Sequence, residues 1–262
     1  MERKTKQELI KKIVEKKEFS DLPEKDVIIS LEKFYKPENP DYENVKITRN
    51  FLRKIYSSFT SRKLLNPKEK EANWVLMKHK STKERYNFYE EIYFRIFKEY
   101  NKDQSLSIID LGCGVNGFSF DFIKKINSKI KYIGVEAIGQ LVKLTNFFFK
   151  KNKFLGDVFH ISLFEEEKIC DLIRMQKSPR VVFMFKVIDS LESMQRNYSK
   201  ELIGKILPFS DKIVLSFATK SLGSRRNFGA QRNWIVKFLE ENYTILDDFE
   251  FGGERYIVFK HK

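Results

Sequence analysis

A glycine-rich segment in the middle of the chain carries the strongest chemical signal. It reads Ile108-Ile109-Asp110-Leu111-Gly112-Cys113-Gly114-Val115-Asn116-Gly117, and it follows a strand-like apolar run and precedes a helical pattern. A loop in this context is typical of a ligand site, because glycine turns sharply and has no Cβ atom to hold a ligand away from the backbone. Gly112, Cys113 and Gly114 are therefore candidate ligand-binding residues.

The carboxyl group of Asp110 distinguishes this loop from the loops of nicotinamide and flavin proteins. Those loops bind a pyrophosphate at a helix N-terminus, and a carboxylate two residues before the first glycine would repel it. A carboxylate suits a cofactor with ammonium and sulfonium groups instead. We therefore predict S-adenosyl-L-methionine as the cofactor, with a nicotinamide- or flavin-dependent enzyme as the alternative.

Glu136 supports the same cofactor. It ends the next strand-like run, about 20 residues beyond the glycines, where an acidic side chain can accept hydrogen bonds from both ribose hydroxyls. We expect Glu136 to bind the ribose, and an exposed strand-end glutamate is the alternative. Asp157 or the turn at residues 163–165 is expected to meet the adenine.

Strand and helix patterns alternate on both sides of these residues. Strand patterns occur at residues 105–111, 131–136, 158–163, 180–186 and 212–217, and helical patterns at 118–126, 140–150, 200–207 and 233–241. A strand pair at 244–249 and 255–260 follows, joined by Gly252-Gly253. Alternating βαβ units with a final antiparallel pair predict an α/β fold with a Rossmann-like sheet over residues 105–262.

Residues 1–104 have helical spacing of their apolar side chains instead. Helices are expected near residues 9–14, 27–35, 45–59 and 82–100, with a further helix opening at Pro67. The chain has 50 Lys and Arg against 36 Asp and Glu, a net charge of +14, which favours a polyanionic partner such as RNA. We predict a basic helical RNA-binding domain at 1–104, whose segments 11–17 and 49–62 follow phosphates; a solubilising surface is the alternative.

The two cysteines, Cys113 and Cys170, are too few for a disulfide framework or a cysteine-rich zinc site. The first residues are charged, and no run approaches the roughly 18 apolar residues that span a bilayer. We therefore expect a cytoplasmic protein with no membrane segment and no metal. We also expect a monomer.

Three segments together resemble the aminoglycoside-resistance 16S ribosomal RNA methyltransferases, class I enzymes that act on guanine N7 in the decoding region. His79-Lys80-Ser81-Thr82-Lys83-Glu84-Arg85 is similar to that family's His-x-Ser-Thr-x-Glu-Arg segment. The glycine loop is similar to its Asp-x-Gly-Cys-Gly-x-Asn loop, and residues 216–223 are similar to its Phe-Pro-x-Lys-Ser-Leu segment. These enzymes also have a basic helical N-terminal domain of about this size, so the resemblance runs over most of the chain and implies a class I methyltransferase sheet.

The resemblance also implies roles for residues outside the glycine loop. Arg85 would grip the methionine carboxylate of the cofactor, since a guanidinium binds a carboxylate through two hydrogen bonds. Lys186 would end the fourth strand beside the target base, and Lys220 and Ser221 would lie at the end of the fifth. These three are the catalytic candidates.

The partner implied by the resemblance is the small ribosomal subunit with its 16S rRNA. Arg225, Arg226 and Arg232 would contact rRNA phosphates, and a solvated basic loop is the alternative. Gly117 and Ala218 stand where the family has proline, and residues 225–229 lack its usual Gly-Met pair. These departures concern the target nucleotide rather than the cofactor.

Guanine N7 has an exposed lone pair and needs no general base, so catalysis would consist mainly of positioning. Neither cysteine suits the nucleophile that cytosine-C5 methylation needs. The alternatives that stay open are a cytosine or adenine amine in rRNA, a tRNA target, a housekeeping role and a non-catalytic rRNA-binding assembly factor. Phe118, Phe217 and Trp234 are candidates for stacking on a flipped base, with a core position as the alternative.

Overall fold

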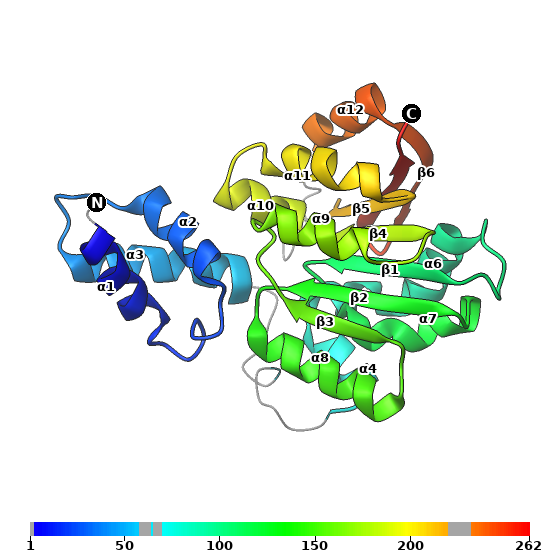
Figure 1. Ribbon diagram of the computed structural model, residues 1–262, viewed down its shortest axis with the longest axis horizontal. Helices are drawn as coiled ribbons and strands as arrows, with labels where there is room; N and C mark the ends of the chain where they lie inside the picture. Colours follow the sequence, from blue (N-terminus) through cyan, green and yellow to red (C-terminus); the bar gives the residue numbers. More distant parts are fainter. Residues whose placement is uncertain (1–2, 58–63, 65–69, 220–231) are drawn as a thin grey trace.

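The computed structural model describes residues 3–57, 64, 70–219 and 232–262. Its centre is a seven-stranded sheet with the order β3-β2-β1-β4-β5-β7-β6 (Figure 1). The strands are β1 (Leu106–Leu111), β2 (Ile130–Glu136), β3 (Gly156–His160), β4 (Arg180–Phe185), β5 (Lys212–Ala218), β6 (Thr244–Phe251) and β7 (Glu254–Lys260). The first five are parallel, and β7 is antiparallel to both β5 and β6. The α/β fold predicted from the sequence, with its closing antiparallel pair, is confirmed.

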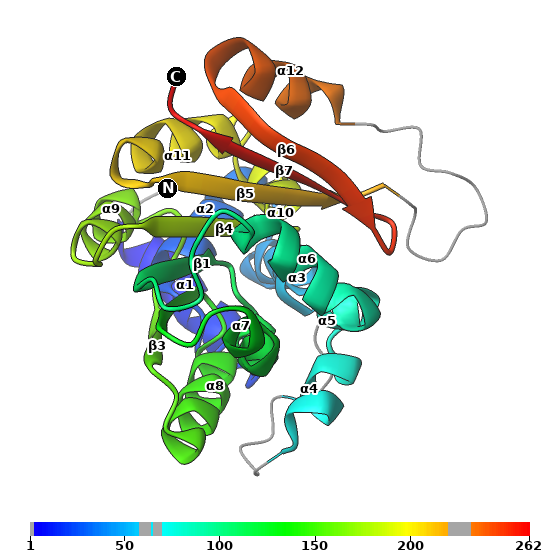
Figure 2. The same ribbon diagram turned by 90° about the vertical axis from the view of Figure 1, so that its right-hand side faces the viewer.

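Both faces of this sheet are covered, and this explains why its central strands are apolar throughout. Successive residues alternate between two cores: Ile108 packs with Phe183 and Val214 on one face, and Ile109 with Val182 on the other. The helices that follow β1 in the chain and cover the sheet are α7 (Phe120–Ile126), α8 (Gly139–Asn152), α9 (Glu166–Arg174), α10 (Ile188–Met194), α11 (Tyr198–Ile206) and α12 (Asn233–Asn242). Figure 2 shows the sheet nearly edge-on between its helical layers.

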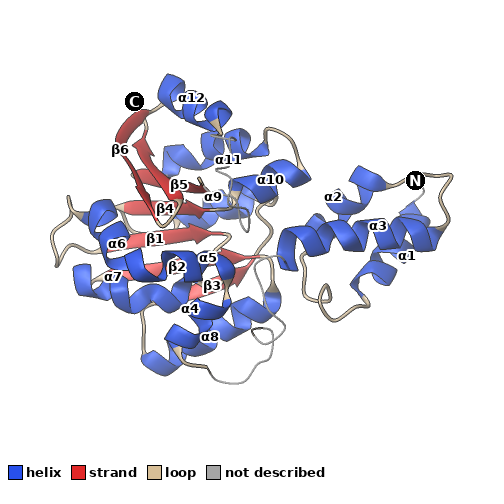
Figure 3. Ribbon diagram, turned by 180° about the vertical axis from the view of Figure 1, so that it is seen from behind, coloured by secondary structure: helices blue, strands red, loops and turns tan. Residues whose placement is uncertain are grey.

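The chain before β1 is helical, and its α-helices fall into two groups. The helices α1 (Arg3–Val14), α2 (Glu24–Phe34) and α3 (Asp41–Leu52) pack on one another and project from one end of the molecule (Figure 3). The helices α4 (Ala72–Lys78), α5 (Lys80–Arg85) and α6 (Tyr89–Phe97) lie with the sheet instead. Tyr93 of α6 hydrogen-bonds Ser119 at 2.6 Å, and Lys212 of β5 reaches Glu99 at 2.8 Å. The helical character predicted for residues 1–104 is therefore found in the described part of that segment, and α6 is part of the packing around the sheet.

Several elements differ in detail from the sequence expectations. The helix expected at 82–100 is α5 and α6, separated by a 3-10 turn at Tyr86–Phe88. The expected strand at 158–163 is β3, which ends at His160. Two helices, α9 and α10, were not expected; both are short, and α9 opens with two glutamates.

Candidate active site

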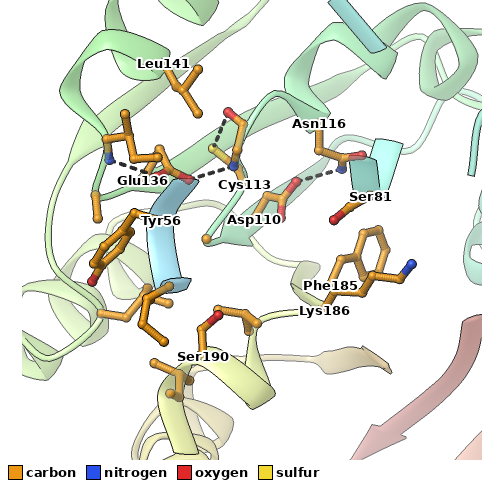
Figure 4. A pocket seen from close by; sticks show the side chains of 18 of the residues that line it. Tyr56, Ser81, Asp110, Cys113, Asn116, Glu136, Leu141, Phe185, Lys186 and Ser190 are labelled. Atoms are coloured by element: carbon orange, nitrogen blue, oxygen red, sulfur yellow. Dashed lines mark hydrogen bonds between the residues drawn. The ribbon is translucent and has the colours of Figure 1, made fainter. Parts of the chain in front are cut away.

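A pocket lies at the carboxyl ends of β1, β2 and β4, where the glycine loop, the α4–α5 segment and the start of α10 meet (Figure 4). Ligands of doubly wound sheets bind at this edge, beside the point where the strand order reverses. The pocket contains six residues that were predicted to bind the cofactor: Arg85, Asp110, Gly112, Cys113, Gly114 and Glu136. It also contains Lys186, one of the three catalytic candidates.

The two glycines of the loop are needed for conformation and for space. Gly112 has φ +70° and Gly114 has φ +53°, in the left-handed region that favours glycine. A Cβ atom at Gly112 would lie 2.8 Å from Cγ2 of Val187, and one at Gly114 would lie 3.2 Å from Nε2 of His79. The loop is thus held between the segment that follows β4 and the turn that precedes α5.

Asp110 is buried at the end of β1, and its carboxyl group is held by two hydrogen bonds. The Asn116 side-chain amide donates to Oδ2 at 2.8 Å, and the Tyr132 hydroxyl donates to the same oxygen at 2.7 Å. Burial raises the pKa of Asp110, while these two donors and the nearby Arg85 charge oppose the rise. Because both donors use Oδ2, the carboxyl group is oriented and Oδ1 accepts no hydrogen bond from the described residues.

Glu136 joins the end of β2 to the glycine loop. Its carboxylate accepts hydrogen bonds from the backbone N–H of Gly114 at 2.7 Å and of Ile138 at 2.8 Å. Burial raises the pKa of Glu136, and these backbone donors counteract it. Each carboxylate oxygen has a second lone pair, so the side chain can accept further hydrogen bonds from hydroxyl groups in the pocket.

Arg85 is 3% exposed and forms a buried ion pair across the fold. Its Nε donates to Glu254 of β7 at 3.1 Å, and its Nη1 donates to Asn116 Oδ1 at 3.0 Å. The guanidinium also lies over the ring of Phe185, 5.0 Å from its centroid. Burial alone would raise the pKa of Glu254, but the charges of Arg85 and Lys186 outweigh it and hold that pKa below its usual value.

Lys186 lies directly after β4, as predicted, in a left-handed backbone conformation with φ +54°. Its backbone N–H donates to the Ser216 carbonyl at 3.0 Å, which fixes the turn. Its ammonium group pairs with Glu84 and, at 3.1 Å, with Glu254. The charge of Lys186 is thus balanced by two carboxylates beside the pocket.

His79 closes the pocket beside Gly114 and is buried at the start of α5. Burial and the neighbouring charges of Arg85 and Lys186 lower the pKa of His79 to about 3. Its imidazole is therefore neutral at physiological pH. The sequence predicted the segment that carries His79 through the family resemblance, but not this position against the glycine loop.

Sequence reasoning missed several pocket residues, among them Asp26 of α2, and Ile55 and Tyr56 of the short π-helix Arg53–Ser57 that continues α3. These three come from the segment of the chain that forms the projecting helices. Apolar residues from three segments surround the same end of the pocket, namely Ile138, Leu141, Leu163, Phe164 and Leu191. The turn at 163–165, expected near the adenine, thus contributes two of them, whereas Asp157 does not line the pocket.

The residues expected to contact RNA or the target base are described only in part. Lys220, Ser221, Arg225 and Arg226 lie outside the described residues. Arg232 is described, and its guanidinium forms two hydrogen bonds with Asp189, at 2.8 and 2.5 Å. Its role toward phosphates stays a prediction, and any phosphate would meet a guanidinium already engaged within the chain.

The aromatic candidates for base stacking separate into two kinds. Phe118 and Phe217 are each 1% exposed and pack in the two cores, so neither can stack on a base from outside. Trp234 is 37% exposed at the start of α12, with the Lys200 ammonium 5.5 Å from its ring. The stacking hypothesis therefore survives for Trp234 alone among these three.

The cysteines are unsuited to nucleophilic catalysis. Burial raises the pKa of Cys113 well above its ordinary value, and that of Cys170 also rises. A nucleophilic cysteine needs a thiolate, which such surroundings disfavour. Within the described ranges, no three His, Cys, Asp or Glu side chains are grouped to hold a metal ion, and no helix is long and apolar enough to cross a membrane.

Comparison with known proteins agrees with the resemblance seen in the motifs. The chain is 27% identical over 199 residues to the 16S rRNA (guanine(1405)-N(7))-methyltransferase of Proteus mirabilis, and 26% identical over 189 residues to the enzyme of the same name from Micromonospora rosea. Each match covers 70% of this chain and 63% of the relative, so the chain spans less than two thirds of these relatives' length. The chain resembles the 16S rRNA guanine-N7 methyltransferases. No family model matches it.

Solved structures show the same fold over the whole chain. The structure of the 16S rRNA methyltransferase RmtF in complex with S-adenosyl-L-homocysteine superposes with a TM-score of 0.78 at 16% identity, covering 100% of both chains. The structure of the 16S rRNA methylase RmtB superposes with a TM-score of 0.75 at 17% identity, covering 98% of both. The predicted class I methyltransferase sheet with a helical N-terminal region is confirmed by these superpositions.

Proposed function

We propose that this protein is an S-adenosyl-L-methionine-dependent methyltransferase that modifies guanine N7 in small-subunit ribosomal RNA. One observation carries the cofactor assignment. Asn116 donates to Asp110 and accepts from Arg85, so that a carboxylate and a guanidinium lie on either side of one amide in the pocket. The amino-acid end of the cofactor carries an ammonium and a carboxylate. The carboxylate of Asp110 and the guanidinium of Arg85 are complementary to these two charges.

The other pocket residues fit the rest of the cofactor. Asp110 would hold the ammonium group through its remaining oxygen, and Arg85 would hold the carboxylate. Glu136 would accept hydrogen bonds from the ribose hydroxyls, and the apolar end of the pocket would take the adenine. Once bound, the cofactor supplies a methyl group on a sulfonium centre.

The charges around Lys186 suit a base that gains positive charge. Guanine becomes cationic when N7 is methylated, so an unbalanced cation beside it would oppose the reaction. Glu84 and Glu254 together balance the charges of Lys186 and Arg85, and His79 is neutral, so these groups add little net positive charge. Because N7 carries no proton to be removed, the role of the residues at the end of β4 is to hold the base in line with the methyl group.

The RNA-binding role of residues 1–104 rests on a basic groove between α1 and α3. Five cationic side chains line it: Lys12, Lys16, Lys46, Arg49 and Arg53. Tyr42 also lines the groove and is 72% exposed, which suits stacking on an unpaired base. Glu15 and Asp41 offset part of this charge. We propose that the groove contacts rRNA phosphates outside the target nucleotide.

A methyl-transfer assay with different RNAs tests this proposal. Purified small subunits, naked small-subunit rRNA and bulk tRNA would each be incubated with the protein and cofactor labelled in its methyl group. Label in small-subunit rRNA, free or assembled, supports the proposal. Label in tRNA alone would show that the substrate is tRNA and not rRNA. Failure to label any RNA would contradict the enzymatic function.

A further inference from the structure

Asp26 lies in the pocket although it belongs to the projecting helices. It is in the first turn of α2, is 2% exposed and lines the same pocket as Asp110 and Glu136. The hydroxyl of Tyr56 donates to its Oδ1, and that hydroxyl also lies 3.3 Å from the sulfur of Met194 in α10. In Figure 4, Tyr56 lies on the Glu136 side of the pocket, away from Lys186.

The second carboxyl oxygen of Asp26 has a buried position and no hydrogen-bond donor. Among the residues that the structure describes, none donates a hydrogen bond to Oδ2. Burial raises the pKa of Asp26, and the nearby Ser162 and Tyr56 hydroxyls oppose the rise; the Ser162 hydroxyl lies close by but forms no hydrogen bond with Oδ2. A buried acceptor without a donor is costly, and such groups are uncommon unless a ligand or water satisfies them.

The order of the strands indicates which part of a ligand Asp26 meets. Along the sheet, Asp110 ends β1, Glu136 ends β2, and Ser162 follows β3 on the far side. A ligand with its amino-acid end at Asp110 and its ribose at Glu136 therefore points its base toward the end of β3. Asp26 lies beside Ser162 there, next to the apolar side chains of Leu163 and Phe164.

We propose that Asp26 accepts a hydrogen bond from the exocyclic amine of the cofactor's adenine. The helices that carry the basic groove then also supply a recognition residue to the cofactor site. The inference rests on the proposed function, because it assumes a cofactor with an adenine. A carboxylate that accepts from an amine would reject a base with a carbonyl oxygen at the same position, since two acceptors would then face each other.

Calorimetric binding of two ligands tests this recognition without measuring activity. The ligands are S-adenosyl-L-homocysteine and its deaminated analogue S-inosyl-L-homocysteine, in which a carbonyl oxygen replaces the amine. The full-length protein is expected to prefer the adenine ligand by roughly 30-fold, the worth of one charged hydrogen bond. In Asp26→Asn the preference is expected to fall to within about threefold of unity, because an amide can also donate to the carbonyl oxygen.

Glu24→Gln is the matched control, since it removes a carboxylate from the same turn of α2 at an exposed position. It is expected to keep the wild-type preference. The ratio of two affinities within one protein does not depend on the fraction folded. The preference between the two ligands can therefore be measured even for a partly unfolded variant. An unchanged ratio in Asp26→Asn would overturn the role of Asp26 alone. Failure of the wild-type protein to bind S-adenosyl-L-homocysteine would overturn the proposed function together with it.

Discussion

Arg85 and Glu254 are 169 positions apart in the sequence, yet they form an ion pair at 3.1 Å in which both side chains are almost completely buried. Glu254 also pairs with Lys186 and accepts a hydrogen bond from the Ser216 hydroxyl at 2.5 Å. A single carboxylate of β7 thus orients the guanidinium proposed to hold the cofactor and the ammonium group at the end of β4.

Removal of this carboxylate is expected to destabilise the fold. Glu254→Ala leaves Arg85 buried without its partner and removes one of the two anions beside Lys186, at a cost of about 3–5 kcal/mol. Urea unfolding followed by circular dichroism would measure it. Glu240→Ala, at an exposed position of α12, should change the free energy of unfolding by less than about 0.5 kcal/mol. Equal effects of the two substitutions would contradict the structural role of Glu254.

Gly112→Ala is expected to damage the cofactor loop. The left-handed conformation costs an alanine about 1–2 kcal/mol, and its Cβ would press on Val187 at 2.8 Å. Binding of S-adenosyl-L-homocysteine should weaken as the loop shifts. Gly204→Ala is the matched control, since no atom lies within 4 Å of a Cβ there and it lies inside α11; it should stabilise the protein by about 0.5–1 kcal/mol. Wild-type binding and stability in Gly112→Ala would refute the loop assignment.

The buried His79 predicts a pH dependence of stability. Its pKa falls from the ordinary 6.5 to about 3 in the folded chain, so between these values the unfolded state binds the additional proton. Stability should therefore decrease as the pH falls from 6.5 toward 3, by about 1.4 kcal/mol per pH unit from this residue. His79→Gln should remove that part of the slope, and His261→Gln, at the exposed end of the chain, should keep it. Parallel wild-type and His79→Gln curves would exclude this contribution.

The basic groove predicts a salt-dependent affinity for RNA. Lys46 is exposed on α3 and lines the groove, so Lys46→Ala should weaken binding and reduce the slope of log K against log salt by about 0.7–0.9, the value for one phosphate contact. Lys129→Ala changes an exposed lysine just before β2, which does not line the groove, and should leave the slope unchanged. Filter binding at several salt concentrations measures both. If Lys46→Ala leaves the slope of log K against log salt unchanged, this lysine does not contact an RNA phosphate.

The parts of the site that the sequence predicted are local ones. Asp110 and the glycines are adjacent in the chain, and Glu136 ends the next strand, so their meeting follows from the parallel pairing of β1 with β2. The resemblance added Arg85 and Lys186 to the same pocket. The central strands could be predicted from the sequence because both of their faces are buried, which makes their residues apolar throughout.

The parts that sequence reasoning missed depend on contacts between distant segments. Glu254 begins the last strand and Asp26 lies in an amphipathic helix, and nothing near either residue indicates a pocket. Their roles come from the antiparallel pairing of β7 with β5 and from the packing of α2 on α10. Asn116 was visible within the glycine loop, but its bridge between Asp110 and Arg85 required the position of α5.

The most direct test of the proposed function is the identity of the nucleoside that the protein methylates. Small subunits would be incubated with the protein and S-adenosyl-L-methionine, their rRNA digested, and the nucleosides analysed by mass spectrometry against standards. The proposal predicts 7-methylguanosine, which Asp110→Asn abolishes and Asp103→Asn, an exposed carboxylate just before β1, retains. A different methylated nucleoside would contradict guanine N7 as the target. If the rRNA gains no methyl group, the assignment as an enzyme is wrong.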